Sequence, residues 1–436
     1  MLRKLIPLIL SLLFVSSAFA QQELGLHFMK DIWQSSKTNP AFTSQAKVHF
    51  SIPSMYYNIS HTGASYNDFV ITNENGENVL DIGAVIDQMD DNNQLFTTVE
   101  TETFSFSIGI KNLKLSFNHA IKFNTFMDYP KELVQLAWNG NSQFIDQTIS
   151  IGPDLQAYAY NEFGIGLAGK ISDISVGGRL KLLTGIGDLS TERTKAEVYT
   201  DPDVYQLTFD TDYLINTSSF FRYDGGNDFE IDFGDASFND VFASNFGTAI
   251  DLGASFKLGN VDISASVIDL GFIGWKKNTV NYYSKGTYTY EGVDISGIIR
   301  DDSLSFEGAL DSIGEVLDFK ETYNNYSTML PAKVYLSASY ALGQNWNFGG
   351  LFYTEIYRGK VYPAFAASAR AKFGNILSIG ATYAIRNKRY DNFGLNAIVK
   401  LGPVQLFGVS DNIISAFQPY DSRNANLRFG LNLLFK

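Results

Sequence analysis

The side chains that could carry acid–base or nucleophilic chemistry are few in this chain, and they are scattered. The histidines are His27, His49, His61 and His119, and the chain contains no cysteine. Nucleophilic catalysis needs a nucleophile, a base and an orienting group within reach of one another, and none of these histidines sits in a recognisable motif of that kind. Without cysteine, a disulfide framework and a thiolate metal site are excluded. We therefore expect no enzymatic activity, no cofactor and no metal site.

Residues 201–240 form a strongly acidic segment that supplies −9 of the formal net charge of −13, with Arg222 as its single basic residue. The carboxylates could bind Ca²⁺ or a cationic partner, because oxygen-rich loops suit hard cations. The simpler interpretation, which we favour, is a solvated surface loop repelled by anionic lipopolysaccharide. The acidic balance argues against nucleic acid as a partner. The acidic residues of the segment are Asp201, Asp203, Asp210, Asp212, Asp224, Asp228, Glu230, Asp232, Asp235 and Asp240.

The N-terminus has the pattern of a secretory signal peptide over residues 1–20. Arg3 and Lys4 precede a mostly apolar run over residues 5–15, and a small-x-small cleavage site ends at Ala20. No cysteine follows that site, so we expect no lipoprotein anchor. No later run of 18 apolar residues could form a spanning helix. A membrane location would therefore require a closed β-barrel.

The end of the chain alternates between apolar and polar residues with a period of two, which places each set on its own face of a strand. This pattern is typical of the closing strand of an outer-membrane barrel. We expect the apolar row to face lipid and the polar row to face the lumen, so that Arg at Leu431 is costly and loss of Arg428 is cheap. The apolar row is Leu427, Phe429, Leu431, Leu433 and Phe435, and the polar row includes Arg428 and Asn432.

The same alternation recurs from residue 46 to the end and gives sixteen candidate strands, which we interpret as one all-β domain, a single transmembrane antiparallel β-barrel over 46–436. Short turns, including Asn161-Glu162, and long loops sort to opposite ends of these strands, and only the short turn Ser172-Asp173 falls on the wrong end. The candidates are 46–60, the two strands of 103–126, 147–160, 163–171, 174–186, 196–214, 245–258, 261–276, 331–342, 345–357, 362–373, 376–387, 392–401, 403–410 and 424–435.

The mature N-terminal segment, residues 21–45, lacks this alternation but contains aromatic residues and the motif Asn39-Pro40-Ala41-Phe42. We expect it to lie in the barrel mouth or lumen as a plug or hatch, and a disordered tail is the alternative.

Several inward rows carry basic residues, which need water or partners inside a barrel. They could line an anion-preferring pore or pair with acidic residues of the plug. His119 falls instead in an apolar, outward row, where a polar ring is disfavoured in lipid. We expect a bulge to turn it inward, with contact to a partner protein as the alternative. The basic residues are Lys114, Lys122, Arg179, Lys181, Arg370, Lys372, Arg386, Lys400 and Arg428.

Several stretches resemble an outer-membrane family of the Bacteroidota whose function is unknown. They run from Gly177 to Gly185, from Ser264 to Trp275, from Ser410 to Ile414 and from Asn426 to Asn432. The Asn39-Pro40-Ala41-Phe42 motif is similar to motifs in the hatch of FadL-type channels and near the start of the PorP/SprF membrane proteins of type IX secretion and gliding. The FadL resemblance implies fourteen strands, so we expect a barrel of 14–16 strands.

These resemblances imply an outer-membrane location in a Gram-negative bacterium and two competing functions. One is a structural or accessory barrel, part of a type IX secretion or gliding system, that binds secretion-system, adhesin or periplasmic proteins. The other is a FadL-like channel for uptake of a hydrophobic small molecule. A channel should contain a continuous apolar pocket, whereas an accessory barrel should be plugged.

Overall fold

The computed structural model describes residues 23–44, 46–72, 78–223, 229–231, 237–290, 319–386 and 389–435. The signal peptide expected over residues 1–20 lies outside these ranges. Across the described ranges, no helix is both long enough and apolar enough to cross a membrane.

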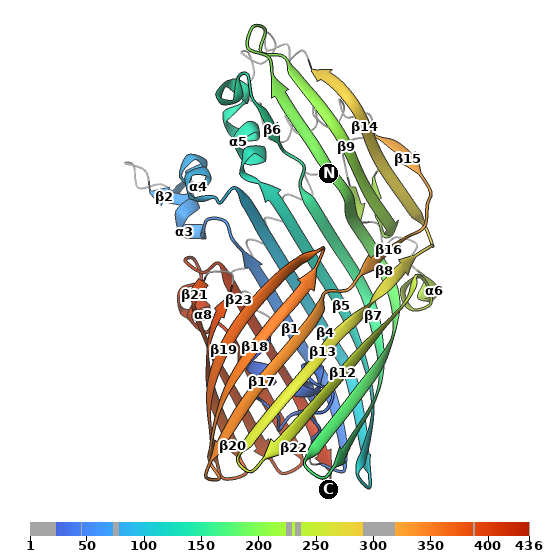
Figure 1. Cartoon of the computed structure of the whole chain (residues 1–436), viewed down its shortest axis with the longest axis vertical. Coiled ribbons are helices and arrows are strands. Elements are labelled where there is room, and N and C mark those ends of the chain that lie inside the picture. Colours follow the sequence, from blue (N-terminus) through green and yellow to red (C-terminus); the bar gives the residue numbers. More distant parts are fainter. Residues whose placement is uncertain are drawn as a thin grey trace.

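The described chain folds into a closed antiparallel β-barrel of fourteen strands, which confirms the all-β barrel prediction (Figure 1). The ring closes where the last strand pairs with the first, with Asn432 opposite Ser51. Closure leaves no unpaired strand edge facing hydrocarbon. The strands are, in ring order, β1 (Val48–His61), β4 (Asn92–Ile110), β5 (Leu113–Pro130), β7 (Asp154–Ile171), β8 (Ile174–Thr200), β12 (Phe246–Leu258), β13 (Val261–Trp275), β17 (Ala332–Leu342), β18 (Trp346–Tyr357), β19 (Lys360–Phe373), β20 (Leu377–Arg386), β21 (Arg389–Leu401), β22 (Val404–Ser410) and β23 (Asn424–Phe435).

A sheet extension rises beyond the barrel at its long-loop end, because β8 continues past its last partner in β12 (Figure 1). There β8 pairs with β9 (Leu207–Ser219), β9 with β14 (Thr279–Tyr290), and β14 with β15 (Lys320–Thr322). Shorter elements complete this end: β6 (Thr148–Ser150) beside β8, β16 (Tyr326–Met329) beside β13, the pairs β2–β3 (Val70–Thr72, Asn78–Leu80) and β10–β11 (Phe221–Tyr223, Phe229–Ile231), and the helices α3 (Tyr66–Phe69), α4 (Ile82–Gln88), α5 (Lys131–Asn139), η2 (Asn141–Phe144), α6 (Phe238–Phe242) and α8 (Ile414–Phe417).

Three of the sixteen candidates differ in the structure, which reduces the number of barrel strands to fourteen. Candidates 147–160 and 163–171 overlap a single strand, β7, which runs straight through the supposed turn at Asn161-Glu162. Candidate 196–214 comprises the end of β8 and the start of β9, both in the extension. Merging the first two also moves Ser172-Asp173 to the tight-turn end, whereas the two-residue turn Arg358-Gly359 between β18 and β19 lies at the long-loop end. The turn expected at Asn161-Glu162 does not form, because both side chains find hydrogen-bond partners on the adjacent strands of the wall.

The outer wall carries an apolar surface made by every second residue of the strands. On β5, Leu113, Leu115 and Phe117 are exposed, whereas Lys114 and Ser116 between them are buried toward the lumen. The same alternation recurs on β7 and β8. An apolar exterior with a polar interior is the arrangement by which a β-barrel meets lipid.

The upper lumen contains an aromatic core. Trp275, Tyr158 and Tyr160 are fully or almost fully buried there, together with Tyr357 and Tyr362. Charged residues and the N-terminal segment occupy the lumen outside this core, so the barrel is filled by its own side chains.

Candidate functional site

Residues 23–44 lie inside the barrel, as two short helical turns, α2 (Leu24–His27) and η1 (Trp33–Lys37). Leu26, Met29 and Ile32 are almost completely buried against β21 and β22. The Asp411 carboxylate accepts hydrogen bonds from the backbone N–H groups of Leu24 and Gly25, at 2.8 and 2.7 Å. These two bonds satisfy donors that a helix start leaves unpaired. We call residues 23–44 the plug.

The motif Asn39-Pro40-Ala41-Phe42 lies at the end of the plug, against β12 and β13. The Asn39 side chain donates to the carbonyl oxygens of Ala254 and Ala265, at 3.2 Å each, and accepts from the Ala41 N–H at 2.9 Å. Glycines make room for this contact. A Cβ atom at Gly253 would stand 2.1 Å from Asn39 Oδ1, and one at Gly177 would stand 2.3 Å from the Pro40 carbonyl oxygen. No larger residue fits at Gly177 unless backbone moves.

On the closing strand β23, the Arg428 and Asn432 side chains lie on the lumen side. Arg428 and Asn432 are fully buried, and Asn432 donates to Gln34 of the plug at 3.0 Å. On the opposite face Leu427, Phe429 and Phe435 are exposed, and Leu431 and Leu433 are half-buried. The two faces of β23 therefore differ, with Arg428 and Asn432 buried and the apolar row more exposed.

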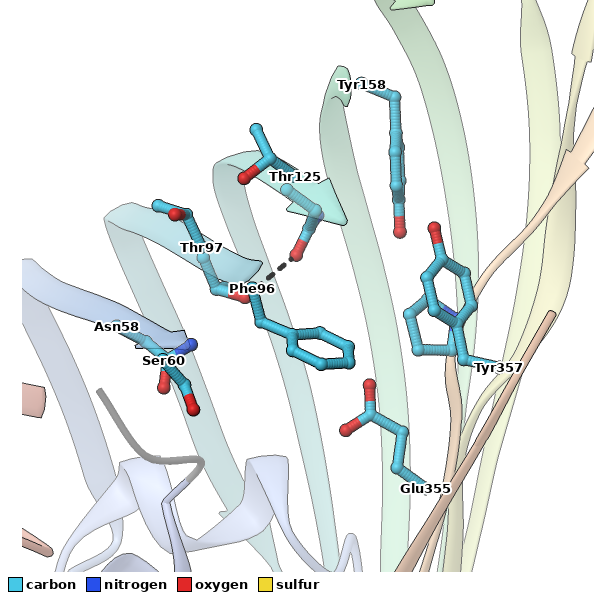
Figure 2. Close-up of a pocket in the computed structure, with 11 residues that line it drawn as sticks. Asn58, Ser60, Phe96, Thr97, Thr125, Tyr158, Glu355 and Tyr357 are labelled. Atoms are coloured by element: carbon cyan, nitrogen blue, oxygen red, sulfur yellow. Dashed lines mark hydrogen bonds between the residues drawn. The ribbon is translucent and has the colours of Figure 1, made fainter. Parts of the chain in front are cut away.

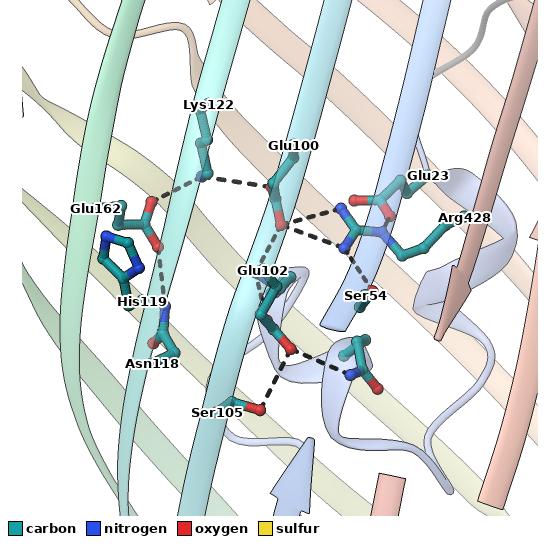
Figure 3. A network of polar contacts seen from close by, with 12 residues as sticks. Glu23, Ser54, Glu100, Glu102, Ser105, Asn118, His119, Lys122, Glu162 and Arg428 are labelled. Atoms are coloured by element: carbon teal, nitrogen blue, oxygen red, sulfur yellow. Dashed lines mark hydrogen bonds and ion pairs between the residues drawn. The ribbon is translucent and has the colours of Figure 1, made fainter. Parts of the chain in front are cut away.

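Arg428 is a fully buried cation of the lumen that pairs with two carboxylates (Figure 3). Its guanidinium forms an ion pair with Glu23 of the plug, lies 3.2 Å from Glu100 Oε1, and donates to the Ser54 hydroxyl at 3.3 Å. It also lies over the Tyr56 ring, 4.8 Å from the ring centroid. Of the two expected ways of solvating Arg428, water or lumen partners, the structure has lumen partners. The expectation that Arg428 is cheap to replace conflicts with these buried pairs.

From Arg428 a chain of buried ion pairs runs along the inner wall, with acids and bases alternating. Lys37 of the plug bridges Glu100 and Glu102, at 2.7 Å each. Buried charges persist only when each is paired and hydrogen-bonded, so these pairs fix the plug and the strands together. The remaining links are Lys122 to Glu100 (3.7 Å) and Glu162 (2.7 Å), Lys181 to Glu162 (3.5 Å), Asp251 (2.8 Å) and Asp269 (2.5 Å), Arg179 to Asp251 (3.4 Å) and Lys333 to Asp269 (2.8 Å).

The basic side chains that face the lumen therefore interact with residues of both the plug and the barrel wall. Arg370 and Lys372 pair with Asp31 of the plug, at 2.8 and 2.9 Å, and Lys114 donates to the plug carbonyl of Ser44 at 2.8 Å. Lys400 is half-buried, and the Arg386 side chain lies outside the described part of the chain.

The sequence did not reveal the acidic residues on the inner face of the barrel wall. Glu100 and Glu102 lie on the part of β4 before Thr103, where the predicted strand began. Their parity is opposite to that of the inward Ser105 and Ser107, because the bulge at Thr103 shifts the alternation, so simple alternation would have placed both acids on the outward face.

His119 stays in the outward row, so the expectation that a bulge turns it inward is wrong. The bulge lies in the neighbouring strand at Thr103, between Glu102 and Phe104. The Thr103 hydroxyl lies 2.7 Å from His119 Nδ1, and Asn161 Oδ1 lies 3.3 Å from Nε2. The loop carrying α6 covers the site: Asn161 donates to the Val241 carbonyl oxygen, and the Phe242 ring lies 6.2 Å from the imidazole. The chain itself shields this ring from lipid.

Two small cavities remain in the lumen above the plug. One, of about 60 Å³, is lined by the charged network and includes Lys122, Glu162 and Lys333. The other, of about 20 Å³, lies beneath the aromatic core. Figure 2 shows the Tyr158 and Tyr357 hydroxyls turned toward one another, with Phe96 and the Glu355 carboxylate nearby. Both spaces suit a few water molecules, since one water needs roughly 10–15 Å³ by this measure.

The acidic segment contributes ion pairs in the part that is described. Asp210 pairs with Lys195 at 2.5 Å, and Asp212 pairs with Arg193 and Lys285 at 3.0 and 2.8 Å. Asp224, Asp228, Asp232 and Asp235 fall outside the described ranges. Among residues within those ranges, no group of three or more potential metal ligands occurs.

A closed antiparallel barrel with an apolar exterior and a charged, plugged lumen defines a transmembrane β-barrel protein. The chain belongs to the family described as Family of unknown function (DUF5723), which matches residues 40–411. The resemblance to a family of unknown function is confirmed at that level.

Solved structures of several bacterial proteins are similar to this chain, and no curated protein matches the sequence. A FadL homologue of Pseudomonas aeruginosa shares 10% identity, with 92% of this chain and 91% of that chain covered and a TM-score of 0.41. The toluene transporter TodX of Pseudomonas putida shares 9% identity, with 96% and 93% covered and a TM-score of 0.40. The translocator domain of the autotransporter NalP of Neisseria meningitidis shares 8%, with 94% and 97% covered and a TM-score of 0.35. The fold assignment rests on the strand pairing itself.

Proposed function

We propose that this protein is a structural or partner-binding barrel of the outer membrane of a Gram-negative bacterium, closed by its own N-terminal segment. The observation that carries the proposal is that the plug is bound to several strands spaced around the barrel. Its charged residues pair with β4, β19 and β23, and its backbone is held by Asp411. Removing such a segment would leave buried charges unpaired, which costs several kcal/mol for each broken pair.

The finer assignment is an accessory component of a type IX secretion or gliding system. Its support is the resemblance of Asn39-Pro40-Ala41-Phe42 to the early motif of PorP/SprF proteins. The partner would be a secretion-system, adhesin or periplasmic protein, and no catalytic step is part of the proposal. A partner would meet the protein outside the lipid band, where Val204 and Tyr205 are among the exposed apolar residues, at 70% and 58% exposure.

A FadL-like channel for a hydrophobic molecule is the second candidate, favoured by the aromatic core of the upper lumen. A channel of this kind needs a continuous apolar path. The cavity directly above the plug is instead lined by paired charges, and an apolar solute crossing it would have to displace them. The accessory role therefore fits the lumen better.

Conductance in planar lipid bilayers tests whether the plug closes the lumen. The intact protein should give no stable open state, and deletion of residues 21–44 should open one. The matched control is Lys276→Gln, a change at the end of β13 that spares the network. Steady conductance or uptake of an apolar solute by the intact protein would favour the channel.

Photo-crosslinking in native membranes tests for a partner. A crosslinker at Val204 should capture a stoichiometric protein, and one at the fully buried Asn432 should capture none. Failure to capture any partner at Val204, together with solute uptake, would contradict the accessory role.

A further inference from the structure

A row of polar side chains crosses the extension from strand to strand. The register places Gln156 of β7 opposite Ser190 of β8, Ser190 opposite Asn216 of β9, and Asn216 opposite Asn281 of β14. Thr322 of β15 then lies opposite Asn281. Residues opposite one another in an antiparallel pair share a face, so all five side chains project from one side of this sheet.

That side is continuous with the lumen. Gln156 accepts a hydrogen bond from Arg358 Nη1, contributed by the turn after β18 across the mouth, at 3.3 Å. The other side of the sheet carries an apolar cluster that packs on α5 and includes Phe209, Ile215 and Tyr282. The polar row therefore overlooks the barrel mouth. Ser190 lies roughly 40 Å along the axis from the tight-turn end of β8, beyond an apolar band of about 25 Å.

A groove of about 420 Å³ opens over this row. It lies between β8, β9, β14 and β15, the strands of the extension in the upper part of Figure 1. Its volume falls in the range of small-molecule sites, roughly 300–1,000 Å³. The residues that matter for its chemistry are Glu192, Arg193, Leu214, Asn216, Asn281 and Tyr283.

The polar lining of the groove is held rigidly. Asn216 and Asn281 are 4% and 3% exposed, and the Asn281 amide donates to Asn216 Oδ1 at 2.8 Å. Asn216 in turn donates to Glu192 Oε2 at 3.0 Å. Glu192 is the extra residue of a β-bulge between Thr191 and Arg193, and a bulge of this kind re-aims a side chain.

In the groove, hydrogen-bond donors and acceptors lie side by side, next to an apolar surface. Asn216 retains one N–H and Glu192 retains carboxylate lone pairs, because each uses only part of its capacity in the row. Tyr283 and Leu214 lie opposite one another across β14 and β9 and supply ring and alkyl surface beside the amides. A sugar ring presents the complementary pattern, since its adjacent hydroxyls both donate and accept while its C–H face stacks on an aromatic ring.

The charges around the groove favour a neutral ligand. Arg193, Lys195 and Lys285 are each already paired with a carboxylate on this face, which leaves no dominant cation for an anion. We propose that this groove binds a neutral saccharide, either free or as the sugar part of a surface glycan. The groove lies above the barrel mouth and shares no lining residue with the plug, so the proposal stands or falls independently of whether the barrel conducts.

Isothermal titration of the full mature protein in detergent tests the proposal. The probes are neutral trisaccharides of glucose, mannose and N-acetylglucosamine, and a polysaccharide released from lipopolysaccharide by mild acid. Saturable binding of a trisaccharide indicates a free sugar as ligand, and binding of the released polysaccharide alone indicates a surface glycan. Both results support the proposal. No saturable binding of any probe to folded protein would overturn it.

Three variants locate the binding. Tyr283→Ala should weaken it by about tenfold through loss of ring stacking. Tyr323→Ala is the matched control, because Tyr323 is 71% exposed and does not line the groove, and it should leave affinity unchanged. Glu192→Gln keeps an acceptor for Asn216 and removes the charge, so it should change affinity by less than about threefold for a neutral ligand. Equal losses in the two tyrosine variants, or a much larger loss in Glu192→Gln, would contradict a neutral saccharide in this groove. Heat-modifiable gel migration confirms folding of each variant.

Discussion

The guanidinium of Arg428, on the last strand of the barrel, is paired with the carboxylate of Glu23, at the start of the described chain. Both groups lie inside the lumen, and the Arg428 side chain has no exposed surface. The pair therefore joins the two ends of the chain at the seam where β23 closes on β1. The seam and the plug depend on one another, because loss of either partner leaves a buried charge without its counter-ion.

Arg428→Gln should be strongly destabilising. Glu23 and Glu100 would lose their shared cation inside the lumen, which costs about 3–5 kcal/mol for a buried pair broken on one side. Unfolding in urea, followed by the shift between folded and unfolded bands on a gel, measures the loss. The double variant Glu23→Gln with Arg428→Gln should recover part of it. A cost below about 1 kcal/mol would mean that water reaches this position.

Leu431→Arg should be destabilising for a different reason. Leu431 lies on the outward face of β23, near the middle of the strand, and a cation at the bilayer midplane costs about 2–4 kcal/mol. Ile171→Arg is the comparison, because Ile171 is 75% exposed and lies beside the tight turn, where the cost falls to about 0–1 kcal/mol. Folding yields in lipid vesicles report both. Similar yields for the two variants would place the lipid band elsewhere on the wall.

Two neighbouring glycines give a matched test of the plug seat. Gly177→Ala would place a Cβ 2.3 Å from the Pro40 carbonyl oxygen, so the backbone must shift, at about 1–3 kcal/mol. Gly178→Ala meets nothing closer than 3.6 Å and should change stability by less than about 0.5 kcal/mol. Because the chain has no cysteine, a single Ala41→Cys reports plug exposure by maleimide labelling. We expect the cysteine of Ala41→Cys to be labelled faster in the Gly177→Ala background and at an unchanged rate in the Gly178→Ala background. Equal labelling rates in both backgrounds would show that the plug does not rest on this glycine.

Asp188, which lies outside the membrane, should make the free energy of unfolding depend on pH. It lies in the extension part of β8, and burial raises its pKa to about 7, although Ser190 and Thr328 donate hydrogen bonds to it. An unfolded aspartate titrates near pH 4, so the folded state holds the proton more tightly. The stabilisation that the Asp188 carboxyl contributes is therefore complete below about pH 4 and is lost as the pH rises to about 7.

Asp188→Asn tests this sign directly. The variant should match the wild type below about pH 4, gain relative stability between about pH 4 and 7, and keep a constant advantage above that. Denaturant unfolding at a series of pH values measures the difference. A difference that stays constant across the whole series would show that Asp188 titrates normally.

The fold and the orientation of its strands could be read from the sequence, because period-two alternation is local information. Leu427, Arg428 and Phe429 lie in consecutive positions, so extended geometry alone assigns their faces. The aromatic residues of the N-terminal segment, which lacks alternation, favoured a plug over a disordered tail but gave no contact for it.

Tertiary structure decided which polar residues belong inside strands and which partners they find. Asn161 and Glu162 look like a turn, yet β7 continues through them because Thr184 and Lys122 on adjacent strands bond their side chains. Pairings such as Arg428 with Glu23, or Ser190 with Asn216 and Asn281, depend on strand register and on closure of the ring. Register and closure join residues hundreds of positions apart, and no local pattern in the chain encodes them.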